Sequence, residues 1–244
     1  MSATYGIELE MSDLSISTAQ QRLNAIGLNW SCKPDGTRGV TAEAVSPILA
    51  YTDLSEGSRA ARALASAGAT VNRQTGFHVH LGADHYGIEG IALLVHNWNL
   101  AHETIGALVA PSRLNNHFCQ SVPLSQIDSW VEHVRAGNIR NMGNGGRYYS
   151  LNLNAYATHR TVEVRLHHGT LNGSKIKAWA EFCGAMAQFS ADGGILDSQF
   201  SNIADREGAR LNAVRNLLDI LSENHLDIAT ASYLKGRAAD LNAR

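Results

Sequence analysis

Polar and apolar residues alternate in three short stretches that lie far apart in the chain. These stretches are Tyr5–Glu10, Gly76–His80 and Thr161–His167. In an extended strand, residues i and i+2 share a face, so the apolar side chains of each stretch can pack on a core. The polar face would carry Glu8, Glu10, His78, His80, Glu163, Arg165 and His167. The pattern therefore predicts a sheet with one packed face and one face of carboxylates and imidazoles, and it places His168 away from that polar face.

Helical periodicity predicts helices between and after these strands. The expected helices span residues 18–26, 55–67, 86–109, 124–136, 174–187, 206–223 and 229–242. Thr18 and Gln21 match a capping box, and Gly27 ends the first helix. A turn at Pro34–Thr37 joins two short extended pieces, and residues 148–153 are expected to pair with 161–167. Strands and helices without regular βαβ alternation predict an α+β fold with an antiparallel or mixed sheet flanked by helices.

One continuous domain is expected, because no internal repeat or linker divides the chain. The weakest seam lies at residues 190–202, so we expect a main domain over residues 1–189. Residues 190–244 would be a helical extension packed on it. Residues 137–146 contain four glycines and three asparagines, which predicts a mobile loop. Whether that loop covers a site or is a plain surface connection is left open.

Composition narrows the class of protein. The 244 residues are 44% hydrophobic, enough for a sizeable core. A net charge of −2 gives no electrostatic reason to expect nucleic acid or an anionic membrane as a partner. The start of the chain has no signal-peptide pattern, and no apolar stretch is long enough to span a bilayer. We therefore expect a cytoplasmic protein. Its three widely spaced cysteines fit free thiols better than disulfides or a zinc ribbon.

The polar face predicted for the sheet suggests a metal site. Carboxylates and imidazoles that converge on one surface bind divalent cations, and an interleaved arginine receives a phosphate or carboxylate. Each stretch alone is also typical of a solvated strand face or an ion-pair ladder, and it is the combination of all three that favours a site. No Walker pattern occurs, so a nucleotide would be held by metal and arginine.

Five motifs, taken in order, resemble one known family. They are Tyr5–Glu10, Lys33–Thr37, Glu43–Pro47, Gly76–Gly82 and Thr161–Thr170. Together they resemble the amidoligases of the carboxylate-amine ligase superfamily, which are similar in fold to glutamine synthetase and glutamate-cysteine ligase. The resemblance extends to about Trp179 and includes Pro111–Arg113 and Arg147–Tyr148. It implies a glutamine-synthetase-like sheet that forms a cleft, and it makes residues 1–189 the catalytic domain.

The resemblance also implies roles for individual residues. The enzyme would use ATP and Mg²⁺ or Mn²⁺ to join a carboxylate to an amine through an acyl phosphate. The implied metal ligands are Glu8, Glu10, His78 and Glu163. His80 and Arg165 would contact the nucleotide, and Arg140, which flanks the glycine-rich loop, could reach its phosphates. The candidate catalytic residues are Arg165, Glu43, Arg147 and Arg113.

Substrates and alternatives remain open at this point. The carboxylate and amine substrates could be amino acids or peptides, and a homo-oligomer is left open. One alternative is a metal-dependent hydrolase that uses the same glutamates and histidines to activate water. The other is a non-catalytic module that binds a nucleotide or peptide.

Overall fold

The computed structural model describes residues 2–143, 146–201, 203 and 208–243. A seven-stranded sheet forms the centre of this part of the chain. Its strands are β1 (Thr4–Met11), β2 (Ser31–Lys33), β3 (Ala42–Val45), β4 (Leu49–Ala50), β5 (Gly76–Gly82), β6 (Leu151–Asn152) and β7 (Thr161–His168). The order is β2-β3-β1-β5-β7-β6, with β4 also paired to β1. Every pairing is antiparallel, so the predicted α+β fold with an antiparallel sheet is confirmed.

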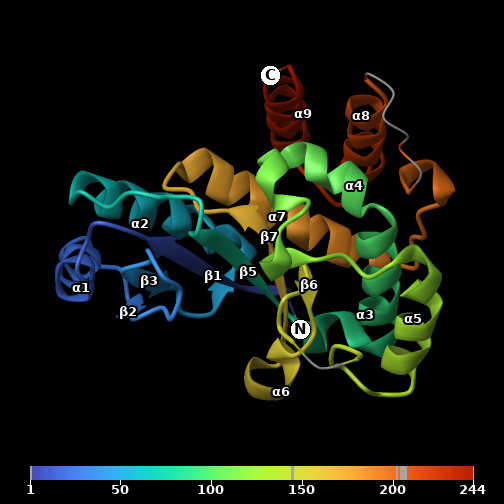
Figure 1. The fold of residues 1–244 in the computed structure, drawn as a ribbon, viewed down its shortest axis with the longest axis horizontal. Helices are drawn as coiled ribbons and strands as arrows, with labels where there is room; N and C mark the ends of the chain where they lie inside the picture. The colour runs from blue at the N-terminus through green and yellow to red at the C-terminus, as the bar shows by residue number, and fades with distance from the viewer. Residues whose placement is uncertain (1, 144–145, 202, 204–207, 244) are drawn as a thin grey trace.

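Helices cover one face of this sheet (Figure 1). The helices are α1 (Ile16–Ala25), α2 (Ser55–Ser66), α3 (Ala83–Leu100), α4 (His102–Ile105), α5 (Ile127–Arg135), α6 (Ala155–His159), α7 (Gly173–Ala191), α8 (Ala209–Ser222) and α9 (Ile228–Asn242). At Gly57 in α2, an added Cβ would lie within 3 Å of both Ile7 of β1 and Ile176 of α7. The helices α2 and α7 therefore pack closely on the apolar side of the sheet, and its polar side is left for the cleft.

The first helix begins earlier than expected. The structure starts α1 at Ile16, and Ser15 rather than Thr18 caps it, accepting a hydrogen bond from the Thr18 N–H. Serine and threonine are both common N-cap residues, and the sequence has Ser15 as well as Thr18 near this end of the helix. The helix ends before Gly27, which has a φ of 72°, as predicted.

The long helix expected over residues 86–109 is wrong, because the structure breaks it into α3, α4 and a short 3-10 turn. Near the break, the Asn99 side chain donates to the Val95 carbonyl and accepts from the Val122 N–H. Asparagine side chains that bind the backbone in this way compete with continued helix. A second irregularity at Gly87 has a φ of 67°, which glycine adopts without strain.

The later strands and helices are of the predicted type, but their ends differ from the predicted ones. The strand expected over residues 148–153 is reduced to β6, and α6 follows it. The helix predicted over 206–223 is α8, and its expected start at 206 and 207 lies outside the described residues. The helix α9 begins after Asp227, whose side chain accepts from the Ala229 and Thr230 N–H groups. The division of the chain at residue 190 stays a prediction.

A β-bulge interrupts the pairing of β5 with β7. Val79 pairs with Val164, but Phe77 pairs with His167, so β7 contains one extra residue between these points. An extra residue reverses which side chains face each side of a sheet. As a result His167 joins Phe77 on the helix-covered side, and His168 lies opposite Gly76.

Arg113 supports this bulge from the side. Its guanidinium donates from Nη2 to the Arg165 carbonyl at 2.8 Å and from Nε to the Leu166 carbonyl at 3.1 Å. These two carbonyls belong to the bulge, where ladder partners are interrupted. The Arg113 side chain, which is buried, therefore replaces hydrogen bonds that the sheet does not supply.

No helix among the described residues combines the length and apolar character needed to cross a membrane.

We predict that Arg113→Met lowers the free energy of unfolding by about 2–6 kcal/mol, because two carbonyls of the buried bulge lose their donors at about 1–3 kcal/mol each. Urea unfolding measures the change. Arg62→Met on the exposed surface of α2 is the matched control, expected to change stability by less than about 0.5 kcal/mol. Equal effects of the two substitutions would show that the bulge does not depend on Arg113.

Candidate active site

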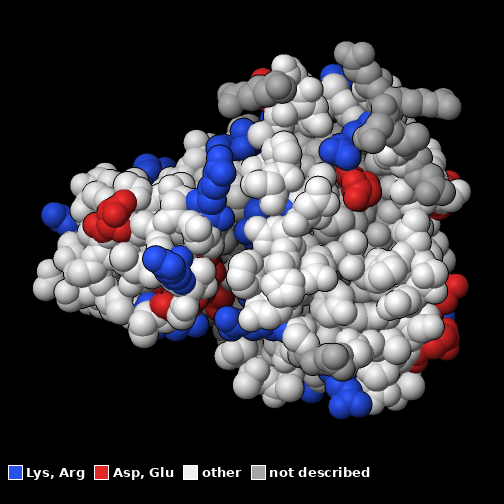
Figure 2. Space-filling model, viewed as in Figure 1, with Lys and Arg blue, Asp and Glu red and all other residues white. Residues whose placement is uncertain are grey.

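The open face of the sheet forms the floor of a cleft with a volume of about 1100 Å³. This is at the upper end of the roughly 300–1,000 Å³ typical of small-molecule sites. Figure 2 shows Asp and Glu atoms deep in the hollow between the two halves of the molecule, with Lys and Arg atoms around it. The lining includes Glu8, Glu10, Lys33, Glu43, His78, His80, Arg113, Arg147, Asn152, Glu163 and Arg165. The cleft therefore has an acidic floor and a basic rim.

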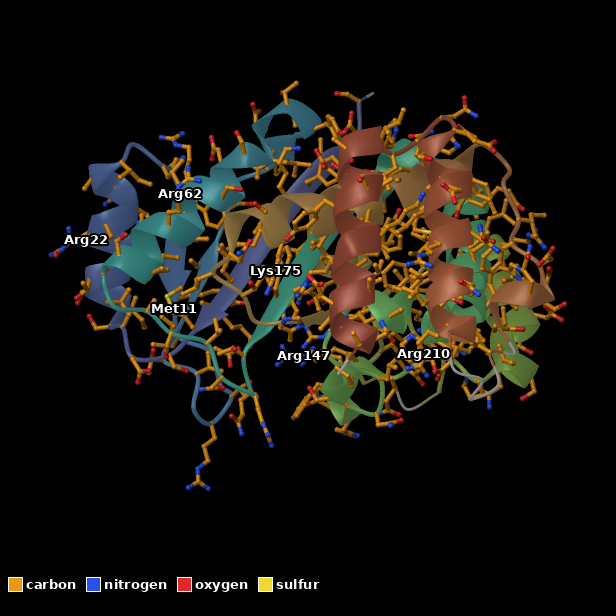
Figure 3. All side chains as sticks on the ribbon, turned by 90° about the horizontal axis from the view of Figure 1, so that it is seen from above. Met11, Arg22, Arg62, Arg147, Lys175 and Arg210 are labelled. Atoms are coloured by element: carbon orange, nitrogen blue, oxygen red, sulfur yellow. The ribbon has the colours of Figure 1, made fainter. Side chains whose placement is uncertain are left out.

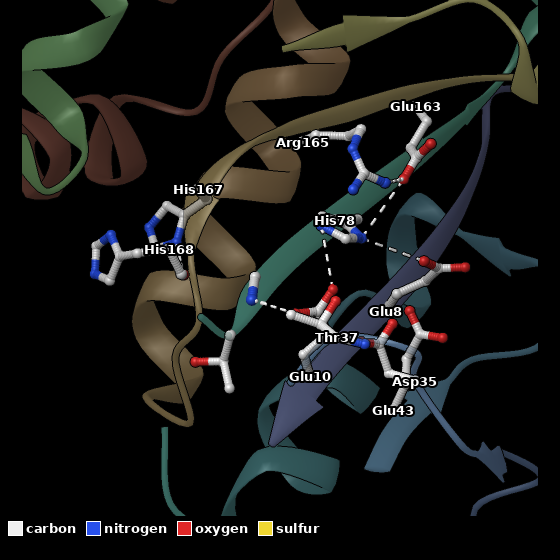
Figure 4. Close-up of polar contacts among 12 residues, drawn as sticks. Glu8, Glu10, Asp35, Thr37, Glu43, His78, Glu163, Arg165, His167 and His168 are labelled. Atoms are coloured by element: carbon white, nitrogen blue, oxygen red, sulfur yellow. Dashed lines mark hydrogen bonds and ion pairs between the residues drawn. The ribbon is translucent and has the colours of Figure 1, made fainter. Parts of the chain in front are cut away.

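The strand register brings the polar side chains together. Glu8 of β1 pairs with His78 of β5, and His80 pairs with Glu163 of β7. Paired residues of antiparallel strands share a face. His78 Nδ1 lies 3.4 Å from Glu8 Oε2 and 3.5 Å from Glu163 Oε1 (Figure 4). His80 Nε2 lies 3.3 Å from Glu8 Oε1. One glutamate thus contacts both histidines.

Two sets of side chains can each hold a cation, and both include Glu8. The first is Glu8, His80 and Glu163, and the second is Glu8, His78 and Glu43. Within each set, one ligand atom from every residue lies within 4.8 Å of the others. We call these five residues the carboxylate-imidazole cluster. Carboxylate oxygens suit Mg²⁺ and imidazole nitrogens suit transition ions such as Mn²⁺, so the donors fit the metals expected from the sequence.

Glu10 lies beside the cluster and is held by the backbone. Its Oε2 accepts from the Gly76 N–H at 2.6 Å, and its Oε1 is 3.6 Å from His78 Nε2. Neither of the two sets includes it. The geometry therefore favours His80 and Glu43 as ligands, beside the predicted Glu8, His78 and Glu163.

Glu163 is oriented from two sides. Arg165 Nη1 donates to its Oε1 at 2.5 Å, and Asn152 Nδ2 donates to its Oε2 at 2.7 Å. The Asn152 Oδ1 in turn accepts from Asn141 Nδ2 at 2.7 Å. Arg165 Nε is buried and has no hydrogen-bond partner among the described residues. The guanidinium thus keeps donor capacity for a ligand in the cleft.

The two glutamates on β1 and β3 have opposite pKa shifts. Burial alone would raise the pKa of Glu8, but hydrogen bonds from His78 and His80 lower it strongly. Burial, together with the negative charge of Glu8, raises the pKa of Glu43 to about 8. Like charges that lie close together do not both ionise at neutral pH without a cation. Without a cation, burial and the charge of Glu8 therefore favour the protonated form of Glu43.

The remaining charged groups of the cleft stabilise one another. Burial opposes ionisation of Glu163, but the charges of His78, Arg165 and His80 lower its pKa. Burial also opposes protonation of His80, yet hydrogen bonding to Glu8 raises its pKa. Lys33 Nζ lies 3.1 Å from Glu43 Oε2, and despite partial burial the charges of Glu43 and Glu8 raise its pKa.

The predicted arginines differ in where they lie. Arg165, Arg113 and Arg147 all line the cleft. Arg113 is engaged by the bulge carbonyls, whereas Arg147 is exposed at the rim. Arg140 is exposed and does not line the cleft, so the structure does not bring it to the site.

His167 was expected beside Glu163 and Arg165, and this prediction is wrong. The bulge turns His167 to the helix side, where its ring lies 5.3 Å from Phe77 and 5.1 Å from Trp179 between ring centroids. His168 pairs with Gly76 in the strand register, and its ring stacks on that of His167 at 4.3 Å between centroids. Figure 4 shows both histidines set apart from the carboxylate-imidazole cluster.

The sequence analysis did not single out Lys33 or Asn152 as site residues. A signal for Lys33 was present, because it begins the Lys33–Thr37 motif, and the structure pairs it with Glu43 across β2 and β3. No local signal marks Asn152. The glycine-rich loop was expected to be mobile, but its Asn141 is buried and is linked to Glu163 through Asn152. Asn144 and Gly145 of that loop lie outside the described residues.

Comparisons with known proteins give a family and a likeness to solved structures. The model of the family described as "Putative amidoligase enzyme" matches residues 29–187, which is more than half of the chain. No curated protein matches the chain. A solved structure of the complex between the prokaryotic ubiquitin-like protein Pup and its ligase PafA aligns over 99% of this chain with 11% identity and a TM-score of 0.44. This chain covers 63% of that one.

The family match includes β3, β5 and β7, and therefore most of the carboxylate-imidazole cluster, while Glu8 and Glu10 precede it. The resemblance seen in the sequence motifs is thereby confirmed. The chain belongs to the amidoligase family.

Proposed function

We propose that this protein is an ATP-dependent amidoligase that joins a carboxylate to an amine through an acyl phosphate. The observation that carries this proposal is the pair of overlapping ligand sets that share Glu8, with Arg165 bound to Glu163 at their edge. A phosphoryl-transfer site needs ligands for divalent cations and a positively charged side chain near the transferred phosphoryl group, and both must lie in one cleft. The cluster and its arginine supply both.

Mg²⁺ or Mn²⁺ fits the donors present in the cleft. Glu8, Glu43, Glu163, His78 and His80 would hold the metal, and when bound it would neutralise phosphate charge. The electrostatics agree, since burial and the charge of Glu8 raise the pKa of Glu43, and a bound cation would balance both carboxylates. Asn152 and Arg165 fix the Glu163 carboxylate, so that ligand is oriented by the protein itself.

The reaction needs activation because an amide does not form favourably from a carboxylate and an amine in water. A carboxylate oxygen of the substrate attacks the γ-phosphorus of ATP, giving an acyl phosphate and ADP. The amine nitrogen then attacks the acyl carbon, phosphate leaves, and the nitrogen gives up a proton. Arg165, which lines the cleft beside Glu163, would stabilise the transferred phosphoryl group with its positive charge. Arg147 at the rim is suited to hold the substrate carboxylate or a phosphate.

Residues 1–189 would carry this chemistry, with residues 190–244 packed against them. Thr230 of α9 donates to Glu181 of α7, and the Asn242 side chain donates to the Ala107 carbonyl. These contacts support a C-terminal extension that belongs to the same unit. We propose amino acids or peptides as the carboxylate and amine substrates.

Glu163→Gln should weaken metal-dependent binding of a non-hydrolysable ATP analogue by about tenfold or more, as expected for an altered metal ligand. Titration calorimetry with Mg²⁺, with Mn²⁺ and with chelator measures this. Glu132→Gln, an exposed glutamate on α5, is the control and should bind normally. Unchanged binding in Glu163→Gln would count against its role as a ligand. Metal binding without analogue binding in the wild-type protein would support the hydrolase alternative.

Arg165→Ala should reduce the ATP turnover by about 10²–10³-fold, the usual cost of removing a charge-stabilising donor. Phosphate release is followed with a carboxylate and amine pair found by screening. Arg215→Ala removes an exposed cation from α8 and should leave turnover unchanged. If the two variants were equally active, Arg165 would have no part in phosphoryl transfer.

The metal-free protein should lose stability as pH rises from 7 to 9. The pKa of Glu43 is about 8 in the folded chain and 4.5 unfolded, so its proton stabilises the fold and is lost in this range. Linkage predicts a loss of about 1 kcal/mol, and the raised pKa of His80 acts in the same direction. Urea unfolding in chelator at several pH values measures the slope. Glu43→Gln should flatten it, and an equally steep slope in that variant would refute the assignment.

A further inference from the structure

The His80 ring is contacted at both of its nitrogens. Its Nε2 atom is buried and lies 3.3 Å from Glu8 Oε1, at the place where the first ligand set converges. Its Nδ1 atom lies 2.8 Å from the hydroxyl oxygen of Thr161, the first residue of β7. One edge of the ring therefore faces the candidate cation position, and the other edge faces a hydroxyl group.

Strand register places Thr161 beside His80. Thr161 pairs with Gly82 and Glu163 pairs with His80, so both side chains of β7 lie on the cleft face next to the same histidine. This end of the sheet is the one where β1 starts, opposite the end marked by Met11 in Figure 3. Thr161 therefore approaches the ring from the end of the sheet, whereas Glu163 lies directly across the strand pair.

Packing limits where the His80 ring can lie. Gly6 of β1 is its register partner, and a Cβ added at Gly6 would lie 3.2 Å from His80 Cβ. The ring of His159, at the end of α6, meets the His80 ring edge-on with 6.0 Å between centroids. These contacts hold the ring in place, but they do not decide which nitrogen carries the proton. The hydrogen bond at Nδ1 makes that choice.

The chemistry of a metal-binding histidine indicates what this hydrogen bond does. A neutral imidazole that binds a cation through Nε2 has its proton on Nδ1. The Thr161 hydroxyl oxygen can accept the hydrogen bond from that Nδ1–H through one of its lone pairs. A hydrogen bond at the second nitrogen is the usual means by which a protein fixes the tautomer and the orientation of such a histidine. The Nε2 lone pair is then directed at the cation.

Two other roles for Thr161 make different demands on the side chain. A purely structural role would not need a hydroxyl, because valine has a similar shape and is as favourable at a half-buried strand position. A nucleotide contact, the role that the sequence resemblance implied for His80, would need the opposite tautomer. Phosphate oxygens only accept hydrogen bonds, so the proton would lie on Nε2 and the hydroxyl would donate to Nδ1. Metal binding without nucleotide separates these cases.

We propose that Thr161 is a positioning residue that accepts a hydrogen bond from His80 Nδ1 and so directs Nε2 at a divalent cation. Glu8 and Glu163 complete the ligand set for that cation. The inference rests on the metal site of the proposed function and adds one residue to it. It makes His80 a ligand of the metal and not of the nucleotide phosphates.

Binding of Mn²⁺ alone, without nucleotide, tests the proposal. Titration calorimetry and the electron paramagnetic resonance signal of free Mn²⁺ both measure it. Thr161→Val should weaken Mn²⁺ binding about 10–100-fold, the usual cost of losing the hydrogen-bond partner of a metal-binding histidine. Thr161→Ser keeps the hydroxyl and should restore most of the affinity. The matched control is Thr52→Val, which removes a hydroxyl from an exposed position and should leave Mn²⁺ binding unchanged.

A second comparison shows whether Thr161 acts through His80. His80→Ala removes the imidazole and should weaken Mn²⁺ binding at least as much as Thr161→Val does. Combining the two substitutions should cause no further loss, because the hydroxyl then has no ring to orient. Urea unfolding of each variant checks that the fold is intact. A further loss in the double variant as large as the loss in Thr161→Val alone would show that the hydroxyl acts elsewhere, and would overturn the proposal.

The remaining outcomes separate this inference from the proposed function. Equal Mn²⁺ binding by the wild-type protein and Thr161→Val would overturn the inference alone. If Thr161→Val kept Mn²⁺ but lost a non-hydrolysable ATP analogue, His80 would be a nucleotide contact, and the inference would fall while the proposed function stood. No Mn²⁺ binding by the wild-type protein would overturn the metal site of the proposed function, and this inference with it.

Discussion

The collection of carboxylates on one sheet face is the constraint on which the rest of this structure depends. Glu8, Glu10, Glu43 and Glu163 come from three strands and lie on one cleft floor. Mutual repulsion would separate them if the sheet did not fix their positions. The apolar side of the same strands, packed under α2 and α7, provides that rigidity. Lys33 and Arg165 offset part of the charge, and burial beside Glu8 raises the pKa of Glu43. Packing of the hydrophobic core thus keeps these mutually repelling side chains close together.

Much of this floor could be predicted from the sequence because strand alternation is a local property. Glu8, His78 and Glu163 follow from their i, i+2 partners, and the structure brings them together. The bulge in β7 could not be predicted in that way. No glycine or proline marks Arg165 and Leu166, and the support comes from Arg113, more than fifty positions earlier. A single extra residue then turned His167 away from the cleft, where its ring stacks on that of His168.

Other differences have the same origin in distant contacts. The sequence does not mark Asn152, whose partners Glu163 and Asn141 come from β7 and from the glycine-rich loop. The division of the long helix near residue 100 depends on Asn99, which binds the segment at Val122. Lys33 was missed for another reason, since its own pattern is weak and only its pairing with Glu43 places it in the cleft. Residue type and periodicity predicted the helices and strands. Their ends and the side-chain partners depend on hydrogen bonds between elements that are distant in the sequence.

The hydrogen bonds from Asn141 through Asn152 to Glu163 have a consequence for how this family could diverge. They orient one oxygen of the Glu163 carboxylate from a loop whose described residues contribute none of the carboxylate-imidazole cluster. Loops tolerate insertion and substitution more readily than strands do. Changes near Asn141 would therefore reorient the Glu163 carboxylate on the cleft floor, while the sheet and its core stay the same.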